Sequence, residues 1–145
     1  MENVSGTGIK AFLQASHTFP VGIWLSIFAD DKDAVSSDTV NINDTAMGVN
    51  GDMVFWGTPN VVPVKFGVID GSEDDKNLSL LLENNRVAKN KASVKDIITL
   101  TIMYPDGRKK LCVNGVIKDG TVLSSVTSNA RRPSREYTFH FENVI

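Results

Sequence analysis

The stretch DGSEDDKNLSLLLENNRVAKNK, Asp70 to Lys91, decides the fold, because it carries helical signals in a chain that otherwise alternates like a sheet. Three of its leucines recur at i, i+3 and i+4, the spacing of one helix face: Leu78, Leu81 and Leu82. Ser72 is a suitable amino-terminal cap for this helix. We therefore expect one helix over about residues 72–88, with its leucine face on a sheet.

This helix has its acidic residues at one end and its basic residues at the other. Glu73, Asp74 and Asp75 lie in the first turn, whereas Arg86 and Lys89 lie near the carboxyl end. The helix dipole favours acids at the amino end and bases at the carboxyl end, so this polarity needs no ligand to explain it. We expect a structural helix that covers the sheet.

Most other apolar segments have the period-two pattern of strands with one buried face. Residues 9–16 alternate in this way, and so does the last strand, whose aromatic face comprises Tyr137, Phe139 and Phe141. Residues 96–104 and 108–114 are joined by Pro-Asp-Gly, which predicts a hairpin. Asn50-Gly51 predicts a second, tight hairpin between two short strands.

Two further strands carry information about edges and interfaces. Pro63 lies within the strand at residues 61–69, and because proline lacks an amide donor it is expected at an edge or bulge. Residues 21–28 are apolar on both faces, so this strand is either sandwiched in the core or committed on one face to another subunit. The whole pattern predicts a mainly β fold in a single domain over residues 1–145. We expect an antiparallel β-sandwich or partial barrel with one flanking α-helix.

The composition is that of an ordinary globular chain. It has 145 residues, of which 41% are hydrophobic, and a formal net charge of −2. Such a balance supplies no general attraction to nucleic acid or to an acidic membrane. Residues 1–75 hold eleven acidic and three basic residues, whereas residues 76–145 hold six acidic and twelve basic ones. This split either marks two surfaces of opposite charge or disappears when folding mixes the halves.

The sequence lacks the motifs of the common catalytic and metal sites, so we expect no enzyme, no cofactor and no metal. His17 and His140 lie in strand-like sequence with no nucleophile placed by a motif. Cys112 is the single cysteine, which excludes an intramolecular disulfide, and we expect it to be a buried structural thiol. We also expect no signal peptide and no membrane span.

Three segments together resemble one protein family: DTAMGVNGDMVFWG, GSEDDKNLSLLLENNRVAKNKASVKDIITLTIMYPDG and the closing YTFHFEN. They are similar to the tail tube proteins of contractile-tailed bacteriophages, and the similarity runs from about Ile9 to Asn143. The resemblance implies a structural virion protein of the tail, made in the cytoplasm of the host bacterium. In such tubes, subunits form hexameric rings that stack head to tail inside a contractile sheath.

The resemblance also implies the partners. The chain is expected to contact further copies of itself, the tail sheath protein, and the baseplate and tail terminator proteins. The tape measure protein and DNA are expected to pass through the lumen without specific binding. Opposite charges on the two ring faces would set the polarity of stacking. We therefore expect ring contacts from an acidic and a basic group, which comprise Asp30, Asp31, Asp33, Arg131, Arg132 and Arg135.

Two other functions remain open. A baseplate or tail-completion protein could share the same fold. A monomeric β-sandwich that binds a ligand, such as a carbohydrate, could use Trp24 and Trp56 as stacking platforms. Both tryptophans lie in apolar strand sequence, however, and we expect them in the core.

Overall fold

The computed structural model describes residues 8–30, 33–128 and 131–145. Across these residues the elements are, in order, β1 (Lys10–Ala15), β2 (Phe19–Leu25), β3 (Val35–Ser36), β4 (Asn43–Met47), β5 (Met53–Gly57), β6 (Val62–Val68), α1 (Glu73–Asn85), β7 (Ile98–Met103), β8 (Lys109–Gly120) and β9 (Arg135–Val144). Seven of these strands form one sheet in the order β2-β1-β7-β8-β9-β6-β3, and β4 and β5 pair separately. The pairings are antiparallel.

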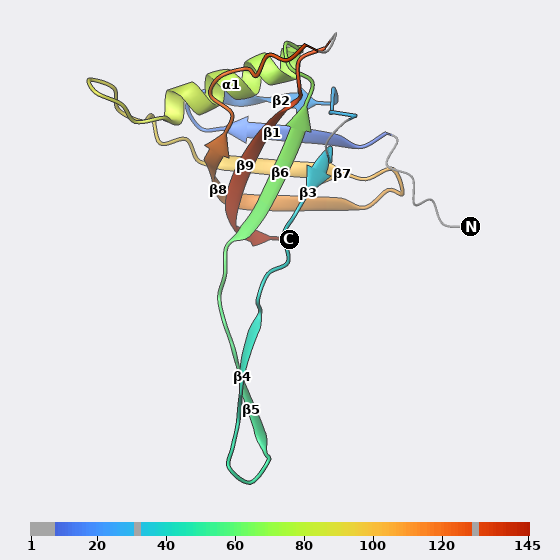
Figure 1. Cartoon of the computed structure of the whole chain (residues 1–145), viewed down its shortest axis with the longest axis vertical. Helices are drawn as coiled ribbons and strands as arrows, with labels where there is room; N and C mark the ends of the chain where they lie inside the picture. The colour runs from blue at the N-terminus through green and yellow to red at the C-terminus, as the bar shows by residue number, and fades with distance from the viewer. Residues whose placement is uncertain (1–7, 31–32, 129–130) are drawn as a thin grey trace.

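Figure 1 shows the large sheet curled into a half-barrel, with α1 across one end and the β4–β5 hairpin projecting from the other. The predicted mainly β fold with one flanking helix is therefore confirmed for the described residues. The hairpin extends well beyond the body, which the sequence did not suggest.

The core fills the concave face of the curled sheet. Leu13 of β1 lies beside Leu100 of β7, and the pairing continues with alternate residues buried along both strands, as predicted. The aromatic face of β9 is fully buried, and its members are Tyr137, Phe139 and Phe141. Leu78 and Leu81 of α1 are also fully buried and close the core from the helix side. Cys112 lies in this core as predicted, and burial raises the pKa of its thiol.

The helix begins where the sequence predicted and ends earlier. The Ser72 hydroxyl accepts a hydrogen bond from the Asp75 amide at 3.2 Å, which caps the amino end. The last helical residue is Asn85, because Arg86 turns to an extended conformation. Two of the basic residues after it bond to one carboxylate: Arg86 and Lys91 lie 2.9 and 3.0 Å from Glu83. Hydrogen bonds from Arg86, then Lys91, lower the pKa of Glu83 to about 2.

Strand β8 is longer than the predicted strand at residues 108–114. Asn114 has a positive φ of 54°, and the register between β7 and β8 shifts beside it, so Asn114-Gly115 forms a bulge instead of ending the strand. Gly115 lies opposite Phe141 of β9, and a β-carbon there would come within 2.2 Å of the Phe141 ring. Glycine at this position is therefore required by the core.

The expectation that both tryptophans lie in the core is wrong. Trp24 is 54% exposed on the convex face of β2, where its ring contacts Phe12 at a centroid distance of 4.9 Å. Trp56 is 51% exposed on the projecting hairpin.

Pro63 of β6 pairs with His140 of β9 on one side. On the other side of β6, the short β3 pairs with Lys65 and Phe66 and does not reach Pro63. In the described structure Pro63 thus lies at an edge, as predicted.

Asp96 joins three parts of the fold although it is almost completely buried. Its carboxylate accepts hydrogen bonds from the amides of His17 and Thr18, the Thr18 hydroxyl and the Asn85 side chain. The Asn85 oxygen in turn accepts from the Asp96 amide at 2.9 Å. Burial alone would raise the pKa of Asp96, but these hydrogen bonds together outweigh it and lower the pKa.

We predict that Asp96→Asn lowers the free energy of unfolding by about 2 to 3 kcal/mol, because hydrogen bonds to a charged group disappear and an amide then faces donors. The folded pKa lies below the ordinary value of 3.8. The charged group therefore stabilises the fold above that value, and its contribution is lost as the pH falls below it. Urea unfolding at a series of pH values should show this acid loss in the parent and not in Asp96→Asn. The exposed control Asp119→Asn should behave like the parent; equal stability of Asp96→Asn would contradict this role.

Candidate assembly surfaces

The β4–β5 hairpin is closed by five residues, not by the tight two-residue turn that Asn50-Gly51 predicted. Met47 pairs with Met53, and the Gly48 amide donates to the Asp52 carbonyl at 2.7 Å. Gly51 supplies a positive φ of 87°, whereas Asn50 does not. The five-residue loop thus needs the left-handed conformation at Gly51 and not at Asn50, whereas the predicted two-residue turn needs it at both.

The root of the hairpin is held by hydrogen bonds of its own. The Asp44 carboxylate accepts from the Asn41 side chain and from the Thr58 hydroxyl, each at 3.0 Å. These bonds, that from Asn41 first, lower the pKa of Asp44. The Thr58 amide also donates to the Ile42 carbonyl at 2.9 Å. These polar contacts therefore hold the two strands together at the base of the hairpin.

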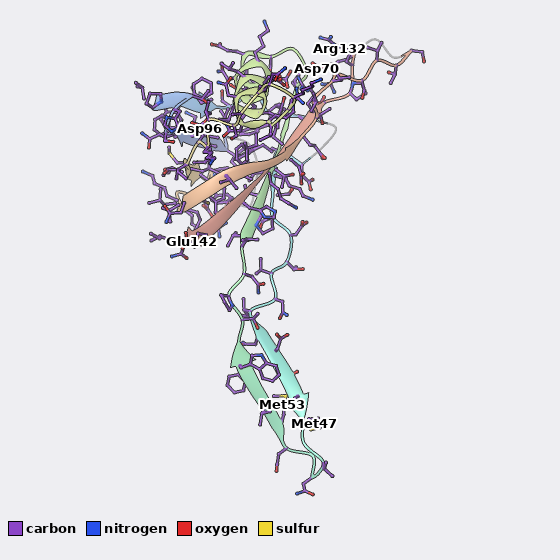
Figure 2. All side chains as sticks on the ribbon, turned by 90° about the vertical axis from the view of Figure 1, so that its left-hand side faces the viewer. Met47, Met53, Asp70, Asp96, Arg132 and Glu142 are labelled. Atoms are coloured by element: carbon purple, nitrogen blue, oxygen red, sulfur yellow. The ribbon has the colours of Figure 1, made fainter. Side chains whose placement is uncertain are left out.

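The hairpin is apolar on both faces. Residues directly opposite each other share a face, so one face carries Met47, Met53 and Phe55, and the other carries Val54 and Trp56. All five side chains are more than half exposed. Figure 2 shows Met47 and Met53 far from the body and close to the tip of the hairpin.

Such an element needs a partner. A lone two-stranded hairpin is at best marginally stable in water, because it has no core to bury. Contiguous exposed apolar side chains on a small protein mark interaction surfaces. The hairpin is thus the strongest candidate for a contact with another molecule.

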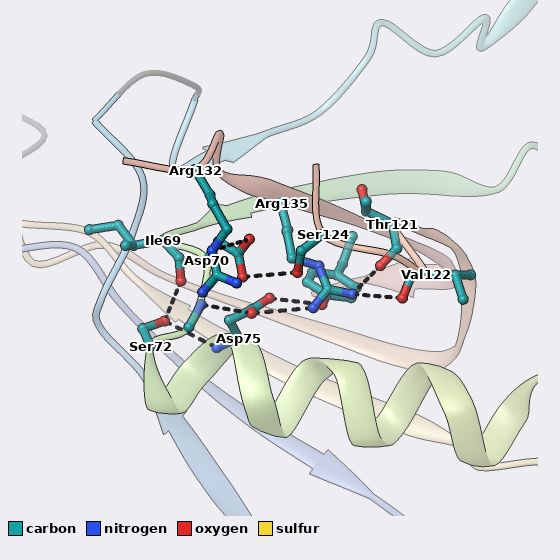
Figure 3. A network of polar contacts seen from close by, with 11 residues as sticks. Ile69, Asp70, Ser72, Asp75, Thr121, Val122, Ser124, Arg132 and Arg135 are labelled. Atoms are coloured by element: carbon teal, nitrogen blue, oxygen red, sulfur yellow. Dashed lines mark hydrogen bonds and ion pairs between the residues drawn. The ribbon is translucent and has the colours of Figure 1, made fainter. Parts of the chain in front are cut away.

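The opposite end of the molecule is organised by buried charge around the start of α1 (Figure 3). The Asp75 carboxylate accepts from the Tyr137 hydroxyl at 2.9 Å and from Arg135 at 3.3 Å, and all three residues are buried. Burial, together with the Asp75 carboxylate, raises the pKa of Tyr137. The Arg135 guanidinium also donates to the carbonyls of Thr121 and Val122.

Asp70, just before the helix, extends this network to the β8–β9 connection. Its carboxylate accepts from the Ser124 hydroxyl at 3.2 Å and lies 3.4 Å from the Arg132 guanidinium. Asp74 binds a different part of the chain, the residues just after β2. Its carboxylate accepts from the amides of Ser26 and Ile27 at 2.8 and 2.7 Å. The three acids hold the end of β2 and the β8–β9 connection to the amino end of α1.

The sequence explained these acids by the helix dipole and missed their specific contacts. The signal was present, since Asp74 lies four residues before Leu78 and Asp75 lies three before it. Both spacings place the acids on the buried face of the helix. A buried carboxylate needs a hydrogen-bond donor or a cation beside it, and the three arginines in residues 131–135 were the available candidates.

The predicted ring-contact residues Arg132 and Arg135 lie at this same end, where they pair with Asp70 and Asp75. Arg131 forms an ion pair with Asp30 of the same chain at 2.5 Å, although both groups lie far apart in the sequence. Asp33 and Arg132 are exposed, and Arg135 is buried against Asp75. Asp31 lies outside the described residues. The structure thus brings one acidic and one basic member together within a single chain and removes Arg135 from the surface.

Residues 8–30, 33–128 and 131–145 contain no group of three or more side chains suited to hold a metal ion. Within the same ranges, no helix is long and apolar enough to cross a membrane.

The sequence model of one family, described as tail fiber protein gp32, matches residues 2–145, almost the whole chain. The chain belongs to the tail fiber protein gp32 family. No curated protein matches it. The predicted relation to tail proteins is therefore confirmed for this gp32-family chain, whereas its assignment to the tail tube remains a prediction.

Solved structures share the fold of this gp32-family chain at low sequence identity. A chain in the cryo-EM structure of the PVC sheath/tube terminator, part of an extracellular contractile injection system in the extended state, matches with a TM-score of 0.62. The identity is 12%, and the match covers 100% of this chain and 96% of that one. A chain of the anti-feeding prophage baseplate, solved with 6-fold symmetry, matches with a TM-score of 0.61 at 6% identity, covering 100% and 95%.

A third match is to a chain in the cryo-EM structure of the anti-feeding prophage tube terminating cap. Its TM-score is 0.54 at 9% identity, and it covers 93% of this chain and 85% of that one. At these identities the comparisons establish the common fold. The gp32-family chain therefore has the fold of chains found in a sheath/tube terminator, a tube terminating cap and a baseplate.

We predict that Asp75→Leu lowers the free energy of unfolding by about 3 to 5 kcal/mol, because it leaves the Arg135 charge buried without its partner. The double variant Asp75→Leu with Arg135→Met should recover most of this loss, since both charges are then replaced by apolar side chains. Urea unfolding of the parent, both single variants and the double variant measures the coupling. Additive effects of the two substitutions would contradict the pairing.

Proposed function

We propose that this chain is a structural tail component that assembles with further copies of itself into hexameric rings, which stack into the inner tube of a contractile tail. The observation that carries the proposal is the projecting β4–β5 hairpin, which exposes apolar side chains on both faces. A hairpin of this kind is stable when other molecules cover it. Because a homo-oligomer repeats one chain, a neighbouring copy is the simplest source of that cover.

The edges of the sheet support lateral contacts between copies. β2 forms one end of the strand order, and the opposite end is β6 with the short β3. Unpaired strand edges invite pairing with another chain, and closing sheets into a ring removes them. The β2 edge also exposes Val21 and Trp24, with Ile27 following the strand. The strand that the sequence left either in the core or committed on one face to another subunit is thus an edge strand with exposed apolar side chains.

The convex face of the sheet is the one that a closed ring would leave to the lumen, because the concave face is filled by the core. Polar side chains on this face include Gln14, Thr99, Thr101, Thr138 and Asn143. Its charges are mixed, with Lys10, Lys65 and Lys109 against Asp119 and Glu136. DNA and the tape measure protein could pass such a wall without specific phosphate binding, since no dense basic surface is formed by these described residues.

A tube terminator or baseplate component is the second candidate. Chains of the same fold occur in the PVC sheath/tube terminator and in the anti-feeding prophage baseplate and cap. Sheath, baseplate and terminator proteins are the partners expected for either role. Negative-stain electron microscopy of the purified chain separates the candidates: long tubes support the tube, single rings support a terminator or baseplate role, and monomers alone contradict both.

We predict that Val54→Ser combined with Phe55→Ser prevents the stacking of rings into tubes, because it removes apolar contact from both faces of the hairpin. The chain should remain folded, since these side chains contribute nothing to the core. Electron microscopy and sedimentation measure assembly, and the melting temperature reports the fold. The matched control Val116→Ser removes an exposed valine from the convex face and should leave assembly intact. Assembly of the hairpin variant like that of the parent would overturn the proposal.

A charge exchange tests the proposed ring contacts of Asp30 and Arg131. The variant Asp30→Arg with Arg131→Asp restores the ion pair within the chain but reverses both charges presented to a neighbour. Exposed pairs are worth only about 0.2 to 1 kcal/mol each, yet a ring repeats them. We predict slower assembly with altered salt dependence, measured by light scattering. Growth and salt dependence identical to the parent would show that the pair serves one chain alone.

A further inference from the structure

A second exposed apolar surface lies at the end of the molecule opposite the hairpin. We call residues 121–128, which follow β8, the end loop. Leu123 and Val126 are each 79% exposed, and Val122 is about half exposed. Figure 2 shows the two ends far apart along the long axis, with Arg132, beyond the end loop in sequence, at one end and Met47 and Met53 at the other.

The end loop is held in this position by buried polar groups. Arg135 donates to the carbonyls of Thr121 and Val122, on one side of Leu123. On the other side, the Ser124 hydroxyl donates to Asp70 at 3.2 Å (Figure 3). Because backbone carbonyls hold the loop on one side of it and the Ser124 side chain holds it on the other, Leu123 is presented outward instead of folding into the core. A fixed, exposed leucine is typical of a contact surface.

We propose that the β4–β5 hairpin of one copy docks on the end loop of the next copy. This inference deepens the proposed function and rests on it, since it names the two surfaces that join successive rings. Both surfaces are apolar and lie at opposite ends of the folded molecule. A contact between them is therefore head to tail, and it can repeat from ring to ring without limit.

Charge favours this contact over one between two hairpins. Residues 41–60 contain Asp44 and Asp52 and no basic residue. Residues 121–135 contain three arginines and no acidic residue, although each arginine is paired with an acid of the same chain: Asp30, Asp70 and Asp75. Arg131 and Arg132 are exposed at the end-loop side. A contact between hairpins of two copies would instead bring like charges together. The β2 edge, the other exposed apolar region considered above, lies at the side of the sheet and suits lateral contacts within a ring.

Mixing two variants tests this contact. Phe55→Glu alters the hairpin and leaves the end loop intact, whereas Leu123→Glu does the reverse. Val116→Glu on the convex face is the matched control. Each variant is purified and assembled alone, then the Phe55→Glu and Leu123→Glu preparations are mixed in equal amounts. Melting temperature establishes that each is folded, and electron microscopy counts rings per particle.

The parent and the control should form stacks. Each altered variant alone should form stacks about tenfold less readily or not at all, because a carboxylate then replaces an apolar side chain inside the interface. The mixture should form pairs of rings and stop there, because one intact hairpin meets one intact end loop and both remaining surfaces are altered. Only a head-to-tail contact between these two surfaces predicts pairs.

Stacks of Leu123→Glu like those of the parent would overturn the docking site and leave the proposed function standing. A mixture without ring pairs, from variants that each form rings, would overturn it equally. A parental chain that forms neither rings nor stacks would instead contradict the proposed function, and the docking with it.

Discussion

The carboxylates at the amino end of α1 hold the architecture together. Asp74 binds the backbone after β2, and Asp75 binds Arg135 and Tyr137 of β9. The helix is thereby fastened to both the early and the late strands of the half-barrel, and its leucines can close the core. Because unpaired charges are costly inside a protein, these contacts also specify one orientation of the helix over the sheet.

The same carboxylate cluster couples the interior to the surface. Asp70 and Asp75 reach the end loop through Ser124 and Arg135, so the buried network determines where Leu123 is presented. The hairpin differs from this end, because the residues of its two strands are exposed or only partly buried. The end loop is therefore a fixed surface. The β4–β5 hairpin is an extended arm that becomes more stable when another molecule covers it. This asymmetry is what a head-to-tail assembly requires.

The sequence predicted much of the body and little of the surfaces. Period-two alternation identified β1, β7 and β9 correctly, since each has one face in the core. The capping serine and the leucine spacing identified α1, although the helix ends at Asn85 and the prediction continued it to about residue 88. These features depend on neighbouring residues in the sequence, so the sequence predicts them.

The errors arise where tertiary or quaternary contacts decide. Trp56 lies in an apolar strand, yet that strand belongs to the projecting hairpin. Arg135 pairs with Asp75, which lies 60 residues away in the sequence. Neither a projecting arm nor a long-range ion pair has a local pattern, so both required the structure.

The central claim is that another copy covers the hairpin in the assembled state. Hydrogen–deuterium exchange tests it most directly, with residues 43–57 compared between the monomer and the assembled particle. We predict that the amides of these residues exchange rapidly in the monomer and become strongly protected on assembly, while β1 and β7 in the core change little. Equal exchange of the hairpin amides in both states would contradict the account.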